Sequence, residues 1–166
     1  STADNGFFHG ERGMADKWLM YEESIRVPFI IVDPRLPQKQ RGKTLDPLVL
    51  NIDVAPTILD YAGISAPSNI QGRSLRPLVE GKRVKWRNDF YYEHHFGFGG
   101  KIPETEGVRT ERWSYLRYVS GNPLVEELYD LRNDAQEEHN LATNKKQQKR
   151  LMQLQQRWAE YRKNLE

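Results

Sequence analysis

The fold is constrained most strongly by a change of residue pattern near Lys85. Beyond it, short segments rich in aromatic and β-branched residues are separated by Gly, Pro and Asn, which predicts an antiparallel sheet of about four strands. We expect these strands at Asp89–His95, Val108–Arg112, Ser114–Val119 and Glu126–Leu131. A helix should close the chain, because Leu151, Leu154, Trp158 and Tyr161 recur at helical spacing.

Before Lys85 the pattern indicates a buried strand and helices. The run from Val27 to Val32 is almost entirely β-branched or aromatic, which predicts a strand buried on both faces. From Asp53 to Ala62 apolar residues recur at helical spacing, with Asp53 as the expected cap, and Gly63 should end that helix. Ser74 to Val79 predicts one further short helix.

These elements together predict an α/β fold in two parts. Residues 1–85 should form part of an α/β sheet domain, and residues 86–166 a small antiparallel sheet subdomain with a carboxyl-terminal helix. The glycine-rich stretch Gly97 to Gly100 is expected to be a connection, since no phosphate-loop lysine and no helix signal accompany it.

An oxygen-rich motif stands near the amino end, where Asp4, Asn5 and Gly6 follow a short extended segment. Asp-Asn-Gly is typical of a tight turn, and in open α/β sheets ligands bind at the carboxyl ends of strands. A carboxylate and an amide carbonyl suit Ca²⁺, or less well Mg²⁺, but they cannot fill a shell of roughly six to eight oxygens. Other ligands would have to come from elsewhere.

Lys17 follows this motif closely enough for its ammonium to meet an anion bound to such a metal. The residues alone leave another interpretation open. Asp-Asn-Gly is common as a plain turn, and a lysine is most often a solvated surface residue.

The sequence around the motif resembles a known enzyme family. The run TADNGFFHGERGMADKWLMYEESIRVPFIIVDP is similar to the type I sulfatase segment in which an Asp-Asn pair ends a strand, a Gly-Glu-x-Gly turn follows, and a lysine comes thirteen residues after the Asp. Asp53 to Leu59, leading to Gly63, resembles a sulfatase helix, and Glu127 to Leu131 resembles the family's closing strand. The resemblance covers nearly the whole chain.

This resemblance implies that Asp4 and Asn5 bind an active-site Ca²⁺ and that Lys17 contacts the sulfate group of a substrate. It also implies a parent enzyme that hydrolyses sulfate esters of small molecules or glycans, in a periplasmic, secreted or lysosomal location. One position departs from the family pattern. Arg12 stands where many members have His, so a positive charge is kept without a titratable imidazole.

The nucleophile of the family is not found in this chain. Type I sulfatases carry Cys-x-Pro-x-Arg or Ser-x-Pro-x-Arg, whose first residue becomes formylglycine, the hydrated aldehyde that attacks sulfur. The chain has no Cys, and Ser65 to Asn69 has Asn where the Arg is required, so we interpret that segment as a loop. The chain therefore resembles only the carboxyl-terminal part of a sulfatase, and by itself it should be inactive.

His94 and His95 lie in the densest polar aromatic cluster of the sequence. Because neighbours in a strand face opposite sides, only one of the two can point into a given pocket. The sulfatase resemblance implies that the smaller subdomain borders the substrate cleft, where such a His could bind sugar hydroxyls. A cross-strand aromatic patch without a binding role is the alternative.

Composition excludes some classes of function. A formal charge of +2 is too small to argue for nucleic acid binding, and the basic run around Lys146 is diluted by glutamines. No apolar stretch reaches the length of a membrane span. Without cysteines no disulfide framework is possible, which leaves the redox compartment undetermined.

Three functional interpretations follow. The first is a sulfatase acting on sulfated sugars. The second is a phosphodiester or phosphonate monoester hydrolase of the same superfamily, since a metal and a lysine would serve a phosphoryl group equally well. The third is a noncatalytic carbohydrate-binding or structural module, which would leave the matched Asp4, Asn5 and Lys17 unexplained.

Overall fold

The computed structural model describes residues 1–96, 99, 102–120 and 122–165, and within these the chain forms two compact units. The helical unit consists of Ser1–Asp4 and Phe29–Asn88, and the sheet unit consists of Asn5–Pro28 and Asp89–Glu166. The mixed α/β class is confirmed. Most of the stretch expected to be a glycine-rich connection, Gly97 to Gly100, lies outside the described residues.

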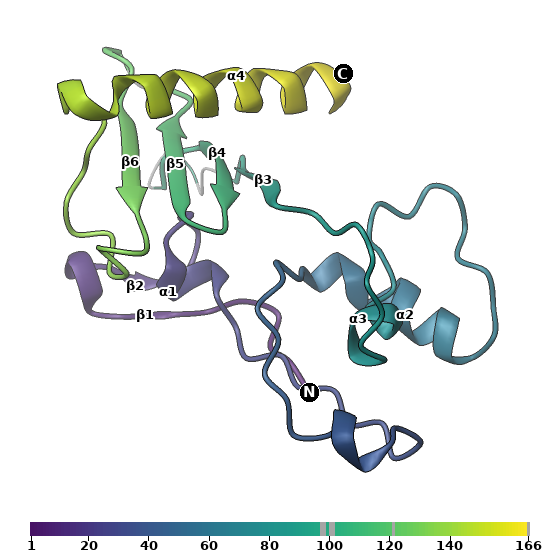
Figure 1. Ribbon diagram of the computed structural model, residues 1–166. Coiled ribbons are helices and arrows are strands. Elements are labelled where there is room, and N and C mark those ends of the chain that lie inside the picture. The colour runs from purple at the N-terminus through teal and green to yellow at the C-terminus, as the bar shows by residue number, and fades with distance from the viewer. Residues whose placement is uncertain (97–98, 100–101, 121, 166) are drawn as a thin grey trace. The chain divides into compact units, whose positions relative to one another are not determined.

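The sheet unit is built on an antiparallel sheet in the order β3-β4-β5-β6, with helix α4 across it (Figure 1). The bounds are β3 Asp89–His94, β4 Thr105–Thr110, β5 Trp113–Tyr118, β6 Glu126–Asp130 and α4 Gln148–Leu165. The four strands and the closing helix predicted from the sequence are therefore confirmed. Only β4 differs by several residues, since it already begins at Thr105.

Helix α4 covers one face of this sheet. Leu151 and Leu154 of the helix pack in one buried cluster with Val108, Tyr115 and Leu128, which come from three successive strands. Trp158 and Tyr161, farther along the same helical stripe, pack against this cluster while half-buried. The helical spacing seen in the sequence thus corresponds to the buried side of α4.

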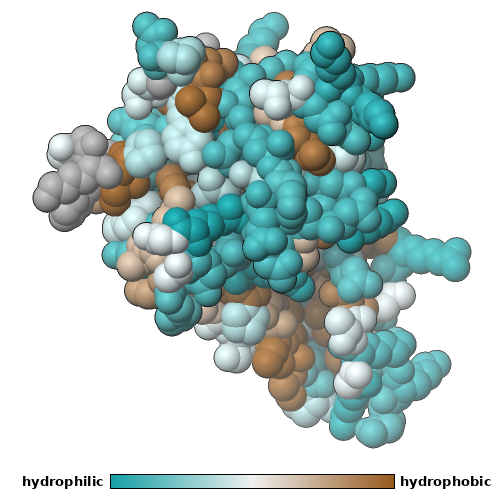
Figure 2. Space-filling view, turned by 90° about the vertical axis from the view of Figure 1, so that its left-hand side faces the viewer, coloured by the Kyte–Doolittle hydropathy of each residue, from teal (hydrophilic) through white to brown (hydrophobic). Residues whose placement is uncertain are grey.

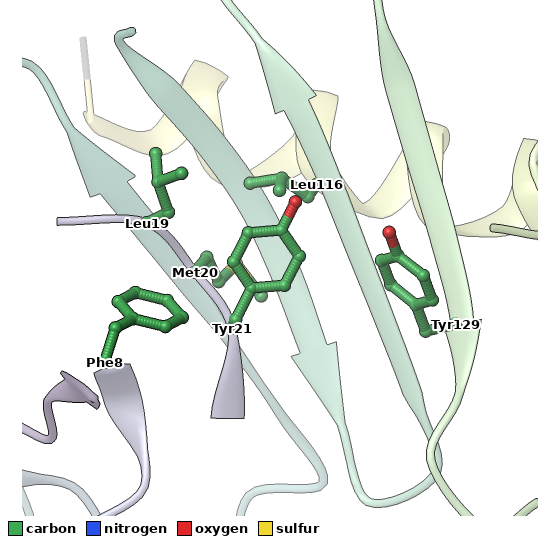
Figure 3. Packing of buried hydrophobic residues seen from close by; sticks show 6 residues of the cluster. All are labelled: Phe8, Leu19, Met20, Tyr21, Leu116 and Tyr129. Carbon is green, nitrogen blue, oxygen red and sulfur yellow. The ribbon is translucent and has the colours of Figure 1, made fainter. Parts of the chain in front are cut away.

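The opposite face of the sheet is covered by the amino-terminal segment of the same unit. This segment contains β1 Phe8–His9, η1 Glu11–Gly13, β2 Ala15–Asp16 and α1 Glu22–Ile25. Figure 3 shows Phe8, Leu19, Met20 and Tyr21 in front of the sheet, beside Leu116 and Tyr129 from β5 and β6, with α4 behind. Because Leu116 and Tyr129 follow Tyr115 and Leu128 directly, strand alternation supplies both cores.

A glycine in β4 allows this second core to close. A Cβ atom at Gly107 would lie 2.2 Å from the Tyr115 carbonyl oxygen and 2.5 Å from the Met20 sulfur. Both distances are far below van der Waals contact, and the first involves backbone of the neighbouring strand, which cannot move aside without breaking the sheet. Met20, fully buried, occupies the space that a side chain at Gly107 would need.

We expect Gly107→Ala to lower the free energy of unfolding by roughly 1–3 kcal/mol or more, because the added methyl group overpacks a rigid site. Urea denaturation followed by circular dichroism measures the loss. Gly13→Ala is the matched control, since a Cβ there meets nothing within 4 Å and only the left-handed φ of 69° disfavours it. A loss at Gly107 no larger than that at Gly13 would contradict this account.

The helical unit is organised around a buried carboxylate. Its helices are α2 Val54–Tyr61 and α3 Arg76–Val79, with 3₁₀ turns η2 Gln38–Gln40 and η3 Asn51–Asp53. The predicted helix and its end at Gly63 are confirmed, and so is the loop at Ser65 to Asn69. The shorter predicted helix begins two residues late, at Arg76.

Asp53 stands at the expected cap position of α2, but its side chain does not bond to the first turn of that helix. The fully buried carboxylate instead accepts hydrogen bonds from the backbone N–H of Leu50 at 2.9 Å and of Arg73 at 2.8 Å. The Arg87 guanidinium adds a bidentate ion pair, with Nη2 at 2.7 Å from Oδ1. Asp53 thus joins its own 3₁₀ turn to the distant segments of Arg73 and Arg87 rather than capping one helix.

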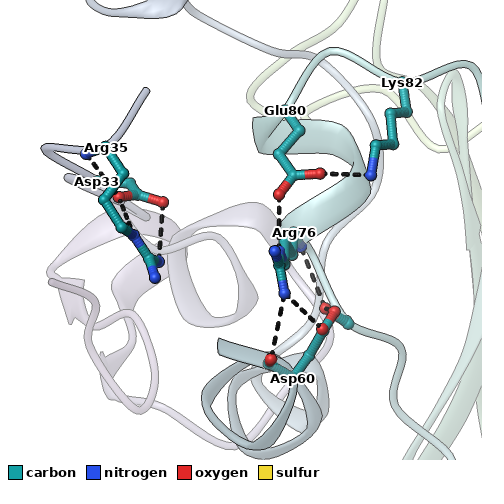
Figure 4. Close-up of polar contacts among 7 residues, drawn as sticks. Asp33, Arg35, Asp60, Arg76, Glu80 and Lys82 are labelled. Carbon is teal, nitrogen blue, oxygen red and sulfur yellow. Dashed lines mark hydrogen bonds and ion pairs between the residues drawn. The ribbon is translucent and has the colours of Figure 1, made fainter. Parts of the chain in front are cut away.

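A chain of charged groups links α2 to α3 (Figure 4). The Arg76 guanidinium lies 3.2 Å from the Asp60 carboxylate and 2.7 Å from that of Glu80, which also receives the Lys82 ammonium at 2.6 Å. These side chains are largely solvated, so the network contributes modestly to stability.

The strand predicted over Val27 to Val32 is wrong for this structure. Only Phe29 makes a β-bridge, to Thr2, and the backbone of Ile30 pairs with Ser1 at 2.8 Å. Ile30 and Val32 are 58% and 85% exposed, so the run is not buried on both faces. The described residues offer only Ser1 and Thr2 as pairing partners, and two residues cannot organise a longer strand.

The compact units of this chain do not decide where the domains of a longer protein divide, so the boundary expected near Lys85 stays a prediction.

The surface seen in Figure 2 is mainly hydrophilic, with hydrophobic residues in separate small groups. Within the described part of the chain, no helix has both the length and the apolar character that a bilayer crossing requires.

Candidate anion-binding site

The structure brings Asn5 and Lys17 together within the sheet unit. The Lys17 ammonium donates a hydrogen bond to Oδ1 of Asn5 at 3.1 Å, and both side chains are half-buried. The Asn5 amide donates in turn to the Gly6 carbonyl oxygen at 2.6 Å, which fixes the direction of its own oxygen. A positive charge is therefore held beside a hard oxygen atom, while the role of Asn5 as a metal ligand stays a prediction.

The turn after Asn5 is held in place by a close backbone approach. The Gly6 N–H donates to the Ser24 carbonyl oxygen at 2.7 Å, at the end of α1. A Cβ on Gly6 would lie only 2.0 Å from the Glu23 carbonyl oxygen, so no larger residue fits. The glycine of Asp-Asn-Gly is thus required by packing against α1, which anchors Asn5.

A short hairpin returns the chain from Asn5 to Lys17. Strands β1 and β2 pair antiparallel, with Phe8 opposite Asp16 and His9 opposite Ala15. The connection η1 is entered through Gly10 at a φ of 118°, a left-handed conformation that glycine adopts at little cost. The hairpin ends at Asp16, so Lys17 emerges directly beside the segment where the hairpin began.

Arg12, the position that departs from the sulfatase pattern, has a packing role in this structure. Its guanidinium lies 4.1 Å from the ring centroid of Tyr21 and 5.9 Å from that of Tyr129, and it donates to the Gln136 carbonyl oxygen. Such cation–π contacts are available to Arg and far weaker for a neutral imidazole. The arginine therefore attaches the hairpin to β6 and its following loop.

His94 lies on the same face of the sheet as the amino-terminal segment. Its ring is 5.5 Å from that of Trp18, and the Tyr92 hydroxyl donates to the Trp18 carbonyl oxygen at 2.9 Å. Both His94 ring nitrogens are buried and have no hydrogen-bond partner among the described residues. Burial, with a smaller contribution from His95, lowers the pKa of His94, which favours a neutral imidazole able to donate and accept.

His95 points to the other face of the sheet, as strand alternation requires. Its Nε2 lies 3.3 Å from Oε1 of Glu106, a fully buried carboxylate that also accepts from the Trp158 indole of α4 at 2.7 Å. The two histidines therefore do not serve one pocket. Their assignment to substrate binding stays a prediction, and the geometry favours His94 over His95 for a site at Lys17.

Asp4 precedes Asn5 directly and is exposed. Asp4 belongs to the helical unit and Asn5 to the sheet unit. Each offers a hard oxygen of the kind that suits Ca²⁺, and the amide oxygen of Asn5 keeps a second lone pair beyond the one facing Lys17. Their joint role as Ca²⁺ ligands stays a prediction. Two ligands remain far short of a complete shell. Any Ca²⁺ at this position would need further oxygens from outside these residues.

A buried carboxyl group that sequence reasoning missed lies under the same segment. Glu137 is 1% exposed, has a left-handed φ of 53°, and accepts a hydrogen bond from the Glu22 backbone N–H at 2.8 Å. Burial, reinforced by the charge of Glu22, raises the pKa of Glu137 from 4.5 to about 7. No pattern in the sequence separates Glu137 from its exposed neighbour Glu138.

The raised pKa of Glu137 makes stability depend on pH. Between about pH 4.5 and pH 7 the folded state binds more protons at Glu137 than the unfolded state does. The contribution of Glu137 to the free energy of unfolding therefore decreases as pH rises. Glu137→Gln mimics the neutral carboxyl. We expect the free energy of unfolding of this variant, relative to that of wild type, to increase by about 2 kcal/mol between pH 5 and pH 8. Urea denaturation at both pH values measures it.

Glu138→Gln is the matched control for this experiment, because it makes the same chemical change at the exposed neighbouring position. A Glu137→Gln difference that stays constant with pH would refute the assignment of a raised pKa.

Comparison with known proteins identifies the class of this chain. Residues 10–164 match the family model described as N-sulphoglucosamine sulphohydrolase, C-terminal. The match covers nearly the whole sequence and agrees with the antiparallel sheet and closing helix. The chain is thus a carboxyl-terminal sulfatase domain and belongs to the N-sulphoglucosamine sulphohydrolase C-terminal family.

Individual relatives agree with the family. An N-acetylglucosamine-6-O-sulfatase of Bacteroides thetaiotaomicron is 40% identical over 162 residues, which cover 92% of this chain and 28% of the relative. A solved protein in complex with its substrate D-glucosamine-2-N,6-O-disulfate superposes with a TM-score of 0.88 at 34% identity, covering 98% of this chain and 33% of that one. The chain thus spans about a third of the length of these relatives.

A phosphonate monoester hydrolase of Agrobacterium radiobacter has the same fold over 98% of this chain and 34% of its own, with a TM-score of 0.82 at 23% identity. At this identity the likeness concerns the fold alone.

Proposed function

We propose that this chain forms the carboxyl-terminal part of a sulfatase that hydrolyses sulfate esters of sugars. The observation that carries the proposal is the contact of the Lys17 ammonium with Asn5 Oδ1 at 3.1 Å, in a chain of the sulfatase family. A fixed ammonium next to a possible metal ligand is the arrangement expected where the charge of a sulfate group has to be stabilised.

Lys17 has a defined task in this proposal. Its ammonium is oriented by Asn5 and by the Trp18 ring, whose centroid lies 5.6 Å from Nζ. Half-burial strengthens its attraction for an anion relative to bulk water. Lys17 would bind a sulfate oxygen and stabilise the negative charge that grows on the transferring group or on the bridging oxygen.

Asp4 and Asn5 would contribute two ligands to a Ca²⁺ ion, with the others supplied from outside this chain. When bound, such an ion would supply charge neutralisation for the sulfate oxygens. The formylglycine nucleophile would likewise come from another part of the parent protein. This part would correspond to the roughly two thirds of the relatives' length that this chain does not cover.

The sugar would be held by the sheet unit. The buried ring nitrogens of His94 have no hydrogen-bond partner among the described residues, and burial lowers the pKa of His94, which favours the neutral imidazole. A neutral imidazole can donate to one sugar hydroxyl and accept from another. The relative named as an N-acetylglucosamine-6-O-sulfatase and the neighbour bound to a sulfated glucosamine support an amino sugar as the substrate class.

A phosphonate monoester hydrolase is the second candidate, because Lys17 and a divalent ion would serve a phosphonate as well as a sulfate. The fold does not distinguish the two, since a phosphonate monoester hydrolase shares it. A noncatalytic module is disfavoured, since it gives no reason for the Lys17 contact with Asn5.

The full-length protein that contains this chain distinguishes these candidates. It should release inorganic sulfate from N-acetylglucosamine 6-sulfate, measured by ion chromatography, at a kcat/KM well above that for a phenylphosphonate monoester or a phosphodiester. Faster turnover of the phosphonate would replace the sulfatase assignment with the second candidate. Turnover of none of them would support a noncatalytic module.

The same assay applied to residues 1–166 alone should give no sulfate release above background. This expectation follows from the missing nucleophile motif, since positioning groups without a nucleophile provide little catalysis. Sulfate release by the purified chain, at a level that mass spectrometry cannot trace to a contaminating sulfatase, would refute it.

Replacing Lys17 tests its role directly. In the full-length protein we expect Lys17→Ala to reduce kcat by roughly 30- to 1000-fold, which corresponds to about 2–4 kcal/mol for one preorganised charge-stabilising group. Lys39→Ala, at an exposed position in η2, is the control and should leave kcat unchanged. Comparable kcat values for Lys17→Ala and wild type would remove Lys17 from the chemical step.

A further inference from the structure

Trp18 adopts a backbone conformation that a tryptophan rarely takes. Its φ of 99° lies far in the left-handed region, where Cβ of an L-residue meets the neighbouring carbonyl oxygen. Such strain persists where the surrounding structure over-determines it, most often at ligand sites. The residue is next to Lys17, at the centre of the proposed anion site.

The contacts of Trp18 explain how the strained conformation is held. The Tyr92 hydroxyl donates to its carbonyl oxygen at 2.9 Å, and the buried Leu19 and Met20 follow it directly. The backbone before it is fixed through Lys17 and its contact with Asn5. The chain is thus tied on both sides, and the indole is directed by these anchors.

Core packing does not account for this position. Trp18 belongs to neither buried cluster of the sheet unit, and its side chain is half-buried, whereas Leu19 and Met20 supply the packing against β5. Its ring instead joins an aromatic wall, by which we mean Trp18, His94 and Phe96. The ring centroids of His94 and Phe96 lie 5.5 Å and 5.8 Å from that of Trp18.

We propose that Trp18 is a specificity-determining residue whose indole stacks on the sugar ring of the substrate, next to the sulfate held by Lys17. The inference rests on the proposed sulfatase function and adds to it the group that recognises the sugar. The Lys17 ammonium lies 5.6 Å from the Trp18 ring centroid, so an anion and an attached ring can be bound by neighbouring side chains.

The chemistry of a pyranose suits this wall. One face of the ring presents C–H groups, which pack on an aromatic surface and leave water, while the hydroxyls at its edge require polar partners. Trp18 offers the larger aromatic surface, and the Lys17 ammonium beside it offers a polar contact. The wall and Lys17 together therefore combine an apolar platform with a hydrogen-bonding group, as carbohydrate recognition requires.

The experiment uses the full-length protein with Trp18→Gly and Trp18→Phe. Glycine tolerates a φ of 99°, so Trp18→Gly removes the ring and also relieves the backbone strain. Two quantities are measured, the KM for N-acetylglucosamine 6-sulfate and the inhibition constant of inorganic sulfate. The first depends on the sugar and the anion together, and the second on the anion alone.

We expect Trp18→Gly to raise KM by about tenfold, Trp18→Phe to raise it less, and the sulfate inhibition constant to stay within about twofold of wild type. Lys17→Ala is the comparison and should weaken inhibition by sulfate. Thermal unfolding checks that both variants remain folded, because Trp18→Gly relieves backbone strain but loses the contacts of the half-buried indole and makes the unfolded chain more flexible.

An unchanged KM for Trp18→Gly in a protein that turns over the sulfated sugar would overturn the platform and leave the proposed function intact. An equal loss in KM and in sulfate inhibition would also overturn it, because Trp18 would then only position Lys17. A wild-type protein that hydrolyses phosphonates but no sulfated sugar would refute the proposed function and the platform together.

Discussion

Packing of the segment Leu19 to Tyr21 against the sheet is the contact on which the candidate site depends. Met20 can reach the sheet only because Gly107 has no side chain, and a Cβ there would lie 2.5 Å from the Met20 sulfur. Lys17 and Trp18 precede this segment directly, so their backbone positions follow from it. The hydrophobic contact of Met20, about three residues after Lys17, thus determines where the Lys17 ammonium lies.

Polar groups beneath the same segment make that placement specific. Tyr21 is buried, and its hydroxyl donates to the Glu127 carboxylate at 2.7 Å, while Arg109 meets Glu22 at 2.7 Å with both side chains largely shielded from water. Breaking one partner of such a pair leaves a buried charge, which costs far more than the pair contributes. The amino-terminal segment is therefore held in one register on the sheet, and a looser attachment would not keep Lys17 beside Asn5.

The sequence was sufficient to predict elements whose residue pattern depends on local neighbours. It was insufficient for elements whose structure depends on a partner far away in the sequence. The strands after Lys85 and helix α4 were predictable because each buries one face of alternating or helical side chains. The opposite orientation of His94 and His95 followed from the same alternation. Val27 to Val32 failed because a strand needs pairing partners, and its composition says nothing of whether they are present.

The same distinction applies to the candidate site. Asn5 and Lys17 stood out as residue types with suitable chemistry, and a hairpin of ordinary length brought them together. The left-handed backbone of Trp18 and the burial of Glu137 had no local signal, since each is imposed by contacts with residues far along the chain. Functional positions defined by such constraints become visible only in three dimensions.

Electrostatics links the two halves of the proposed site. The Lys17 ammonium already occupies one lone pair of Asn5 Oδ1, so a divalent cation on the other would place two like-signed centres near one oxygen. Their repulsion is strong at short range in a partly shielded environment. An anion between them converts that repulsion into two attractions. In the proposed sulfatase, cation and sulfate would therefore favour each other's binding, and Asn5 would be the residue that couples them.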